Sequence, residues 1–95
     1  MSDSISLDST VVAEDGLLLT ELDREVVILS KAKNLYYGLN ETGAQVWNLI
    51  QEPRPVQEIH DVMLEKLDVE PEVWERDLID VLQALVDQGL AKTVE

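Results

Sequence analysis

The hydrophobic period of the chain changes at Leu39, and this change limits the folds open to it. Between residues 10 and 39 the apolar side chains form short runs rich in valine, leucine and isoleucine, which is typical of strands. After residue 39 they recur every three or four residues, which is the period of an amphipathic helix. The sequence therefore predicts an α+β domain in which a small antiparallel sheet precedes three helices.

The strand region contains four apolar runs with short connections between them. Asp15-Gly16, Asp23-Arg24 and the polar stretch 30–34 separate the runs, and connections of this length favour successive hairpins. We expect three or four strands in one meander. The runs are TVVAED (10–15), LLLTEL (17–22), EVVILS (25–30) and LYYGL (35–39).

Each helical segment has its own start or stop signal. Thr42 and Gln45 have the spacing of a capping box, and Pro55 both ends the first helix and suits the first turn of the second. Pro71 is expected to open the third helix and Gly89 to close it as a left-handed cap. The buried stripes are predicted to contain Val46, Trp47, Leu49 and Ile50, then Val56, Ile59, Val62, Met63 and Leu67, and finally Trp74, Leu78, Val81, Leu82 and Leu85.

Length and charge exclude several classes of function. The 95 residues predict one domain over residues 10–95, after a flexible N-terminus at residues 1–9. Twenty acidic residues against seven basic ones give a formal charge of −13, which repels nucleic acid and anionic lipid and attracts basic partners. With neither a signal peptide nor an apolar run of about 20 residues, a cytoplasmic protein is expected.

Catalytic and metal-binding patterns are not found in the sequence. His60 is the only histidine and cysteine is absent, so neither a histidine-rich metal site nor a cysteine nucleophile is available. His60 with the carboxylates around it is interpreted as part of a solvated helix face, and so are the carboxylates between residues 70 and 80. No glycine-rich phosphate loop is present. We expect no catalytic residue, no metal and no cofactor.

The run LYYGL raises a different possibility, because it is the last strand before the helices. One of its sides is expected to have no partner strand, and the run contains neither the proline nor the charge that often protects such an edge. An extended peptide could add to it as a further strand. Tyr36 and Tyr37 alternate faces, so one belongs to the core and the other to the surface. Gly38 permits close approach of a helix, and Asn40 can satisfy the backbone at the junction.

The ordered pattern of residues 10–92 resembles the PqqD-like peptide chaperones, also called RiPP recognition elements. The resemblance rests on LLLTELDREVVILS, on LYYGLNETGAQVWNLI and on the closing helix that ends in DQGL. Members of this family share a strand that ends in Tyr-x-Leu-Asn, an apolar residue and tryptophan in the first helix, and a similar helix end.

The resemblance implies a winged-helix-like fold and a binding role without catalysis. In such domains the leader segment of a ribosomally made precursor peptide adds beside the third strand, in the groove between that strand and the third helix. By position, the strand edge is formed by Leu35, Tyr36, Tyr37 and Gly38, and the helix wall by Asp77, Asp80, Val81, Ala84 and Leu85.

Within the family, the chain is most similar to the stand-alone recognition protein of lasso-peptide biosynthesis, which works with a leader-cleaving protease and a cyclase. The alternative is a PqqD-type chaperone that serves a radical-SAM enzyme. A winged-helix transcription regulator is disfavoured, because Arg76 is the single basic residue of the third helix. A small enzyme subunit or a structural assembly factor is a further alternative. A monomer or weak dimer is expected.

Overall fold

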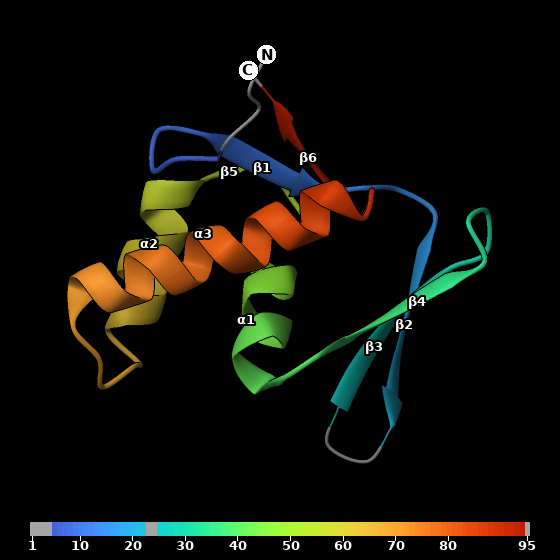
Figure 1. Cartoon of the computed structure of the whole chain (residues 1–95), viewed down its shortest axis with the longest axis horizontal. Coiled ribbons are helices and arrows are strands. Elements are labelled where there is room, and N and C mark those ends of the chain that lie inside the picture. Colours follow the sequence, from blue (N-terminus) through green and yellow to red (C-terminus); the bar gives the residue numbers. More distant parts are fainter. Residues whose placement is uncertain (1–4, 23–24, 95) are drawn as a thin grey trace.

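The described residues fold into two three-stranded antiparallel sheets and three helices. Figure 1 shows how these elements are arranged. The structure is a computed structural model that describes residues 5–22 and 25–94. The predicted α+β class is confirmed. The elements are β1 (Thr10–Ala13), β2 (Leu17–Leu22), β3 (Glu25–Ser30), β4 (Leu35–Leu39), α1 (Glu41–Leu49), β5 (Arg54–Pro55), α2 (Val56–Leu64), α3 (Pro71–Asp87) and β6 (Ala91–Val94).

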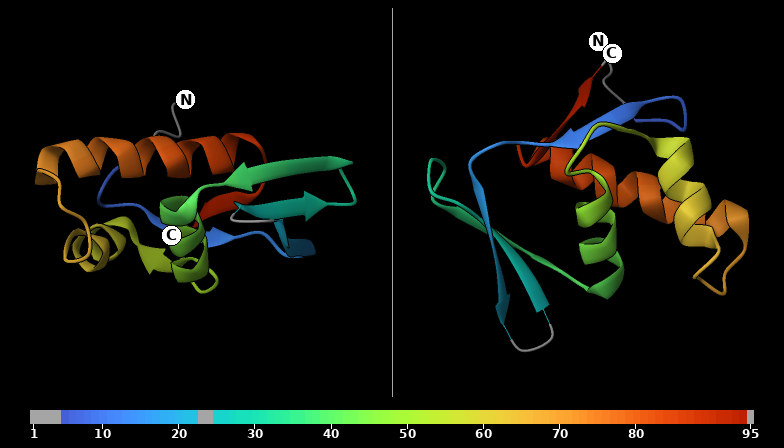
Figure 2. Two further views of the ribbon diagram at one scale, coloured as in Figure 1. Left: turned by 90° about the horizontal axis from the view of Figure 1, so that it is seen from below. Right: turned by 180° about the vertical axis from the view of Figure 1, so that it is seen from behind.

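Strands β2, β3 and β4 form the predicted meander, with β3 in the middle. Leu17 to Leu22 pair with Ser30 to Glu25, and Val26 to Ser30 pair with Leu39 to Leu35. In Figures 1 and 2 this sheet lies to one side of the helices, and β4 leads directly into α1. Both outer strands therefore have one edge that faces away from β3.

The first predicted strand does not belong to this meander, and that expectation is wrong. β1 lies between β5 and β6 in a second sheet, with Thr10 opposite both Pro55 and Val94. Gly16, at φ +77°, turns the chain from one sheet to the other instead of closing a hairpin. The pairing is non-local, because β6 follows all three helices. A pattern of local turns cannot reveal such a partner.

The helices pack around one core that also takes in the inner faces of both sheets. α3 runs across the molecule, with α1 and α2 on one side of it (Figures 1 and 2). Both tryptophans are buried, as predicted. The fully buried side chains include Val11, Ile28, Val46, Ile50, Val56, Ile59, Leu78, Leu82, Leu85 and Leu90.

The start of α1 differs from the predicted capping box. Asn40, not Thr42, is the N-cap residue, and its side-chain Oδ1 accepts a hydrogen bond from the Gly43 backbone N–H at 2.7 Å. A further backbone bond joins the Ala44 N–H to the Asn40 carbonyl at 2.8 Å. The predicted role of Asn40 at the strand-to-helix junction is confirmed, and it fixes where β4 ends and α1 begins.

The C-terminal end of α3 follows the prediction. Gly89 has φ +76°, and the N–H of Leu90 reaches back to the Leu85 carbonyl at 2.8 Å. This is the left-handed helix end that glycine favours. Lys33, from the turn between β3 and β4, donates from Nζ to the Gly89 carbonyl at 3.4 Å. The turn of the sheet therefore contacts the end of α3.

Residues 5–9, which belong to the N-terminal segment expected to be flexible, are packed against the body of the domain. Ile5 is buried, and its N–H donates to Gln83 Oε1 of α3 at 3.1 Å. Leu7 packs against the core. The rest of that segment, residues 1–4, lies outside the described residues. In the part of the chain that the structure describes, no helix is long and apolar enough to cross a membrane.

Candidate functional site

Alternation along β4 assigns different positions to its two tyrosines. Tyr37 lies on the inner face, opposite Ile28, and packs against the core. Tyr36 lies on the outer face and is 72% exposed. Gly38 shares that outer face, and a Cβ placed on it would meet nothing within 4 Å, so the expected close approach of a helix at Gly38 is wrong. The question that the sequence left open is therefore answered, with Tyr37 as the packing residue and Tyr36 as the surface residue.

The outer edge of β4 carries the backbone groups that the edge-strand argument requires. β4 pairs with β3 on one side only among the described strands. In an antiparallel strand, alternate residues direct their N–H and C=O groups to opposite sides, so about half of these groups face this edge. The strand has five residues and ends at the Asn40 cap. An extended peptide can pair with it over that length.

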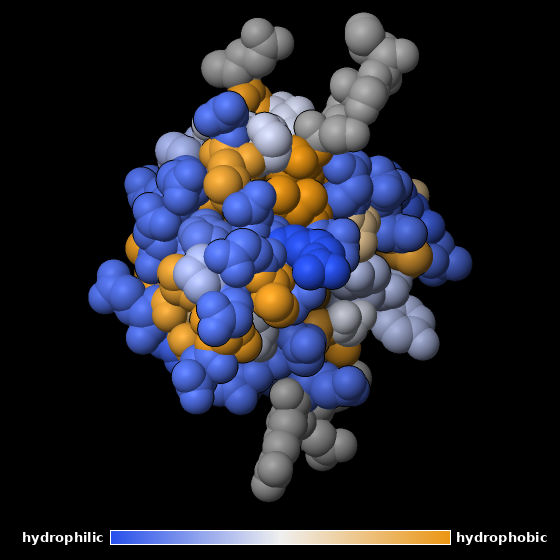
Figure 3. Space-filling view, turned by 60° about the vertical axis from the view of Figure 1, so that its left-hand side comes forward, coloured by the Kyte–Doolittle hydropathy of each residue, from blue (hydrophilic) through white to orange (hydrophobic). Residues whose placement is uncertain are grey.

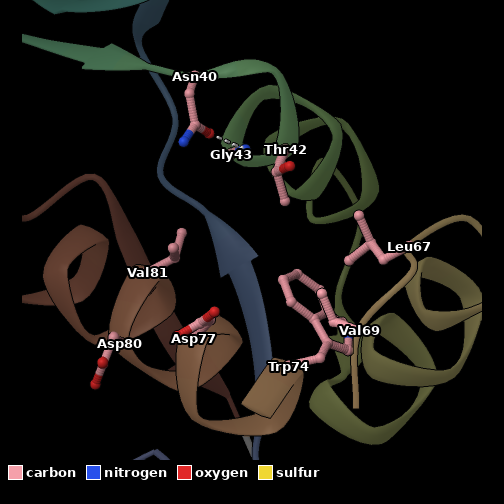
Figure 4. A pocket seen from close by; sticks show the side chains of 9 residues that line it. All are labelled: Asn40, Thr42, Gly43, Leu67, Val69, Trp74, Asp77, Asp80 and Val81. Carbon is pink, nitrogen blue, oxygen red and sulfur yellow. Dashed lines mark hydrogen bonds between the residues drawn. The ribbon is translucent and has the colours of Figure 1, made fainter. Parts of the chain in front are cut away.

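A pocket of about 410 Å³ lies where the end of β4 and the start of α1 face α3. Figure 4 shows Val81 pointing across the opening toward Asn40, while Trp74 points toward the loop that follows α2. Asp77 and Asp80 also come from α3; the Asp77 carboxylate points into the opening, whereas the Asp80 carboxylate points away from it. The lining residues are Asn40, Thr42, Gly43, Leu67, Val69, Trp74, Asp77, Asp80 and Val81.

At the other end of β4, the β3–β4 turn contacts the end of α3 through the hydrogen bond from Lys33 to the Gly89 carbonyl. The Lys33 ammonium lies at the C-terminal end of α3, where the partial negative charge of the helix dipole favours a cation. A Cβ at residue 89 would collide with the Lys33 Nζ, so Lys33 would have to move if Gly89 were replaced. The site thus has two distinct ends, an acidic pocket at Asn40 and a lysine contact at the β3–β4 turn.

The predicted wall residues of α3 lie at different depths. Asp77 and Asp80 are exposed, Val81 and Ala84 are partly buried, and Leu85 is fully buried at 0% exposure. Leu85 belongs to the core. It is therefore not available to a peptide at the surface, although the resemblance implied that it is part of the helix wall. Ala84 does not line the pocket. The exposed strand edge also includes Leu35, which with Tyr36 borders a smaller hollow near the turn.

Charge around the site is mainly negative. Figure 3 shows one face of the molecule on which hydrophilic side chains predominate and apolar patches are small and separate. On α3, the carboxylates Asp77 and Asp80 are the charged groups that line the larger pocket. Among the described residues, no group of three His, Asp or Glu side chains is arranged to hold a metal ion. The site is suited to a peptide that offers apolar and basic side chains.

His60 does not line the pocket but binds Trp74, which does. Its interpretation as part of a solvated helix face is wrong. It is 7% exposed, between α2 and the start of α3. Its Nε2 lies 3.2 Å from the Pro71 carbonyl oxygen, and its Nδ1 lies 3.2 Å from Asp61 Oδ1. The Trp74 indole N–H donates to the His60 carbonyl at 3.1 Å. These bonds hold Trp74 in the pocket wall and attach the beginning of α3 to α2.

The carboxyl group of Asp61 is affected by this arrangement. A hydrogen bond from the His60 ring, followed by one from the Gln57 side-chain amide, lowers the pKa of Asp61 below its ordinary value. The Gln57 Nε2 to Asp61 Oδ1 distance is 3.0 Å. Since both contacts favour the ionised carboxylate, Asp61 stays charged in mildly acidic solution.

Several pocket residues were not foreseen as site residues from the sequence. Trp74 was expected only as a core residue, and Thr42 only as a helix cap. Leu67 and Val69, both within the connection 65–70 between α2 and α3, complete the apolar side. Val69 is 45% exposed. It is the single aliphatic residue of the acidic stretch DVEPE, and this is the sequence signal that could have identified it.

Together the fold and the site define an α+β domain of winged-helix outline, with one open strand edge beside its last helix. The family model described as coenzyme PQQ synthesis protein D (PqqD) matches residues 25–91. The chain therefore belongs to the PqqD family. The match includes β3, β4 and all three helices.

Two solved structures have the same fold as this chain. The chain is similar to the structure described as TbiB1 in complex with the TbiA(beta) leader peptide, with 33% identity and a TM-score of 0.76, over 88% of this chain and 98% of that one. It also resembles lasso peptide synthetase B1 complexed with the leader peptide, with a TM-score of 0.75 over 86% and 96% of the two chains. At 20% identity this second likeness shows the fold alone. A search of curated proteins finds no match.

Proposed function

We propose that this chain captures the leader segment of a ribosomally made precursor peptide by strand addition at the outer edge of β4. The observation that carries the proposal is the open β4 edge beside α3, in a PqqD-family chain that is 33% identical to a protein solved with a leader peptide. Backbone hydrogen bonds supply affinity in this binding mode, and side-chain pockets supply selection.

The groups at the site have separate tasks in this proposal. The leader pairs with the strand edge formed by the consecutive residues Leu35, Tyr36, Tyr37 and Gly38. Val81 and the pocket wall accept apolar side chains, and Asp77 attracts a basic one. Charge sets mainly the association rate and the register, whereas filling of the pocket sets the residence time.

The chain then delivers the bound precursor to its processing enzymes without catalysing a reaction itself. We infer a leader-cleaving protease and a cyclase of lasso-peptide biosynthesis as these partners, because the sequence pattern resembles the stand-alone recognition protein of that pathway and one structure of the same fold is described as lasso peptide synthetase B1 with its leader peptide. Holding a substrate beside an enzyme raises its effective concentration, which accelerates processing without any added catalytic group. Work of this kind takes place in the cytoplasm, where precursor peptides are made, and a monomer suffices for it.

A matched pair of strand variants tests the proposal. The leader peptide encoded beside this chain is labelled, and its binding is measured by fluorescence anisotropy. Tyr36→Lys places a charge on the exposed face of β4, whereas Leu18→Lys places the same charge on β2, where Leu18 is 48% exposed. We expect Tyr36→Lys to weaken binding about tenfold and Leu18→Lys to leave it within about twofold. Equal effects, or no binding by the unmodified chain, would refute the proposal.

A further inference from the structure

The β2–β3–β4 sheet has a second open edge, on β2, at the side opposite β4. β2 has six residues, one more than β4, and pairs with β3 alone among the described strands. No other backbone hydrogen bond involves the described residues 17–22. Leu18 and Leu19 are each 48% exposed. Proline and lysine, which commonly protect edge strands, are absent from the run LLLTEL.

A pocket of about 320 Å³ lies beside this edge, between β2 and the C-terminal part of α1. Trp47 is buried at its base, and the side-chain amide of Gln51 donates to the Trp47 carbonyl at 2.9 Å. Asn48 is exposed at its rim. The arrangement repeats that of the first site, where an open strand edge also lies next to a helix and a pocket. The lining residues are Glu14, Asp15, Gly16, Leu17, Leu18, Leu19, Trp47, Asn48 and Gln51.

We propose that the outer edge of β2 and this pocket form a second strand-binding site, whose ligand is an extended basic segment of a partner protein. Glu14 and Asp15 line the pocket, and Glu21 is exposed farther along the strand. Glu14 Oε1 lies 3.9 Å from the Lys92 Nζ, and Asp15 and Glu21 carry further negative charge along this edge. Among the described residues no basic side chain lines the pocket, and the chain has a formal charge of −13. A basic segment is therefore attracted to this edge, whereas a second copy of the chain would bring the same carboxylates into contact.

The position of the second site suits a role in delivery, and this role rests on the function proposed above. A leader on β4 and a partner strand on β2 would extend one sheet from both sides to five strands. Four inter-strand spacings of about 4.8 Å would then separate the two added strands by roughly 19 Å. Neither ligand would cover the edge that the other requires, so both can bind at the same time.

A probe peptide separates the two edges without knowledge of the partner. The probe is an acetylated hexapeptide of alternating valine and lysine, and its charge-reversed control alternates valine and glutamate. Each is titrated into the isotope-labelled full chain, and backbone amide and tryptophan indole shifts are recorded. We expect the lysine probe to shift the amides of residues 17–22 and the Trp47 indole, and the glutamate probe to leave them unchanged.

Two substitutions complete the test. Leu18→Lys, on β2, should weaken binding of the lysine probe about tenfold, while Val62→Lys, which adds the same charge on the exposed side of α2, should weaken it less than about threefold. Circular dichroism verifies that both variants fold. Equal weakening, shifts confined to β4 and α3, or β2 shifts that grow with protein concentration in the absence of probe would each overturn the second site. Leader binding at β4 is scored on separate amides, so its failure is distinguishable.

Discussion

Adjacent tyrosines on one strand have opposite tasks, because a strand turns successive side chains to opposite faces. Tyr37 packs against the core while Tyr36 is 72% exposed. We predict that Tyr37→Ala lowers the free energy of unfolding by about 2 kcal/mol, less than the loss of a fully buried aromatic ring. Tyr36→Ala should change it by less than about 0.5 kcal/mol. Urea denaturation followed by tryptophan fluorescence measures both values.

The same pair of variants should behave in the reverse order in leader binding. Removal of the Tyr36 ring takes away exposed aromatic surface at the proposed site, and we expect an affinity loss of about tenfold. An outcome in which Tyr36→Ala binds normally but unfolds more easily would contradict the assignment of faces.

Asn40 is the residue on which the junction of β4 and α1 depends. Its side chain accepts the Gly43 N–H, whereas Thr42 lies within the first turn of the helix. We predict that Asn40→Ala costs about 1 kcal/mol of stability. Thr42→Ala is the matched control and should cost clearly less. Thermal unfolding of the two variants decides between them, and a larger effect of Thr42→Ala would restore the capping box that the sequence suggested.

Asp61 provides a pH-dependent test of its contact with His60 on the same helix, α2. Its pKa is lowered by the hydrogen bonds from His60 and Gln57. The stability that these bonds contribute is therefore complete above the ordinary pKa of aspartate and is lost as the pH falls through the lowered pKa. We predict that His60→Ala raises the pKa of Asp61 toward its ordinary value, as measured by NMR titration of the carboxyl carbon. An unchanged pKa would show that His60 is not the cause.

At the scale of elements, the edge of β4 can be tested by its backbone. Gly38 tolerates a Cβ in open space, so Gly38→Ala should bind the leader with little change. Gly38→Pro removes a backbone donor and restricts the strand, and we expect it to abolish detectable binding. Amide spectra of both variants show whether β3 and β4 still pair. A folded Gly38→Pro variant with undiminished affinity would exclude strand addition at this edge.

The elements also mark the limit of sequence interpretation. The meander of β2, β3 and β4 was predictable because its turns are local and its apolar runs are distinct. The place of β1 was not, since its partners are the two residues of β5 and a strand that follows α3. The burial of His60 was equally hidden, because the groups that satisfy its ring include the Pro71 carbonyl of another helix.

For the site, the position of LYYGL before the helices predicted the open strand edge. The sequence did not predict which side chains of α3 are exposed and which are buried. Val81 lines the pocket while Leu85, one turn later, is fully buried. Four residues advance a helix by slightly more than one turn, so the two side chains point in similar directions and the neighbouring elements decide which one is covered. That information is tertiary, and the sequence pattern alone does not contain it.

In the whole molecule, the β2–β3–β4 sheet of this small acidic domain lies to one side of the helices, and each of its two outer strands has an open edge among the described strands. α3 lies toward the β4 edge and α1 toward the start of β2, and a pocket adjoins each edge. The core is fixed by buried residues from both sheets and all three helices. We propose that the β4 edge, which lies next to α3, binds the leader as an additional strand.

A two-dimensional NMR titration of the full chain with the leader peptide encoded beside it tests this claim most directly. If the leader adds as a strand beside β4, we expect chemical-shift changes concentrated in residues 35–39, in the exposed side of α3 around Asp77 and Val81, and at the Trp74 indole. We also expect slower hydrogen exchange of alternate β4 amides. Shift changes that leave residues 35–39 and α3 unaffected, or the absence of any change, would contradict it.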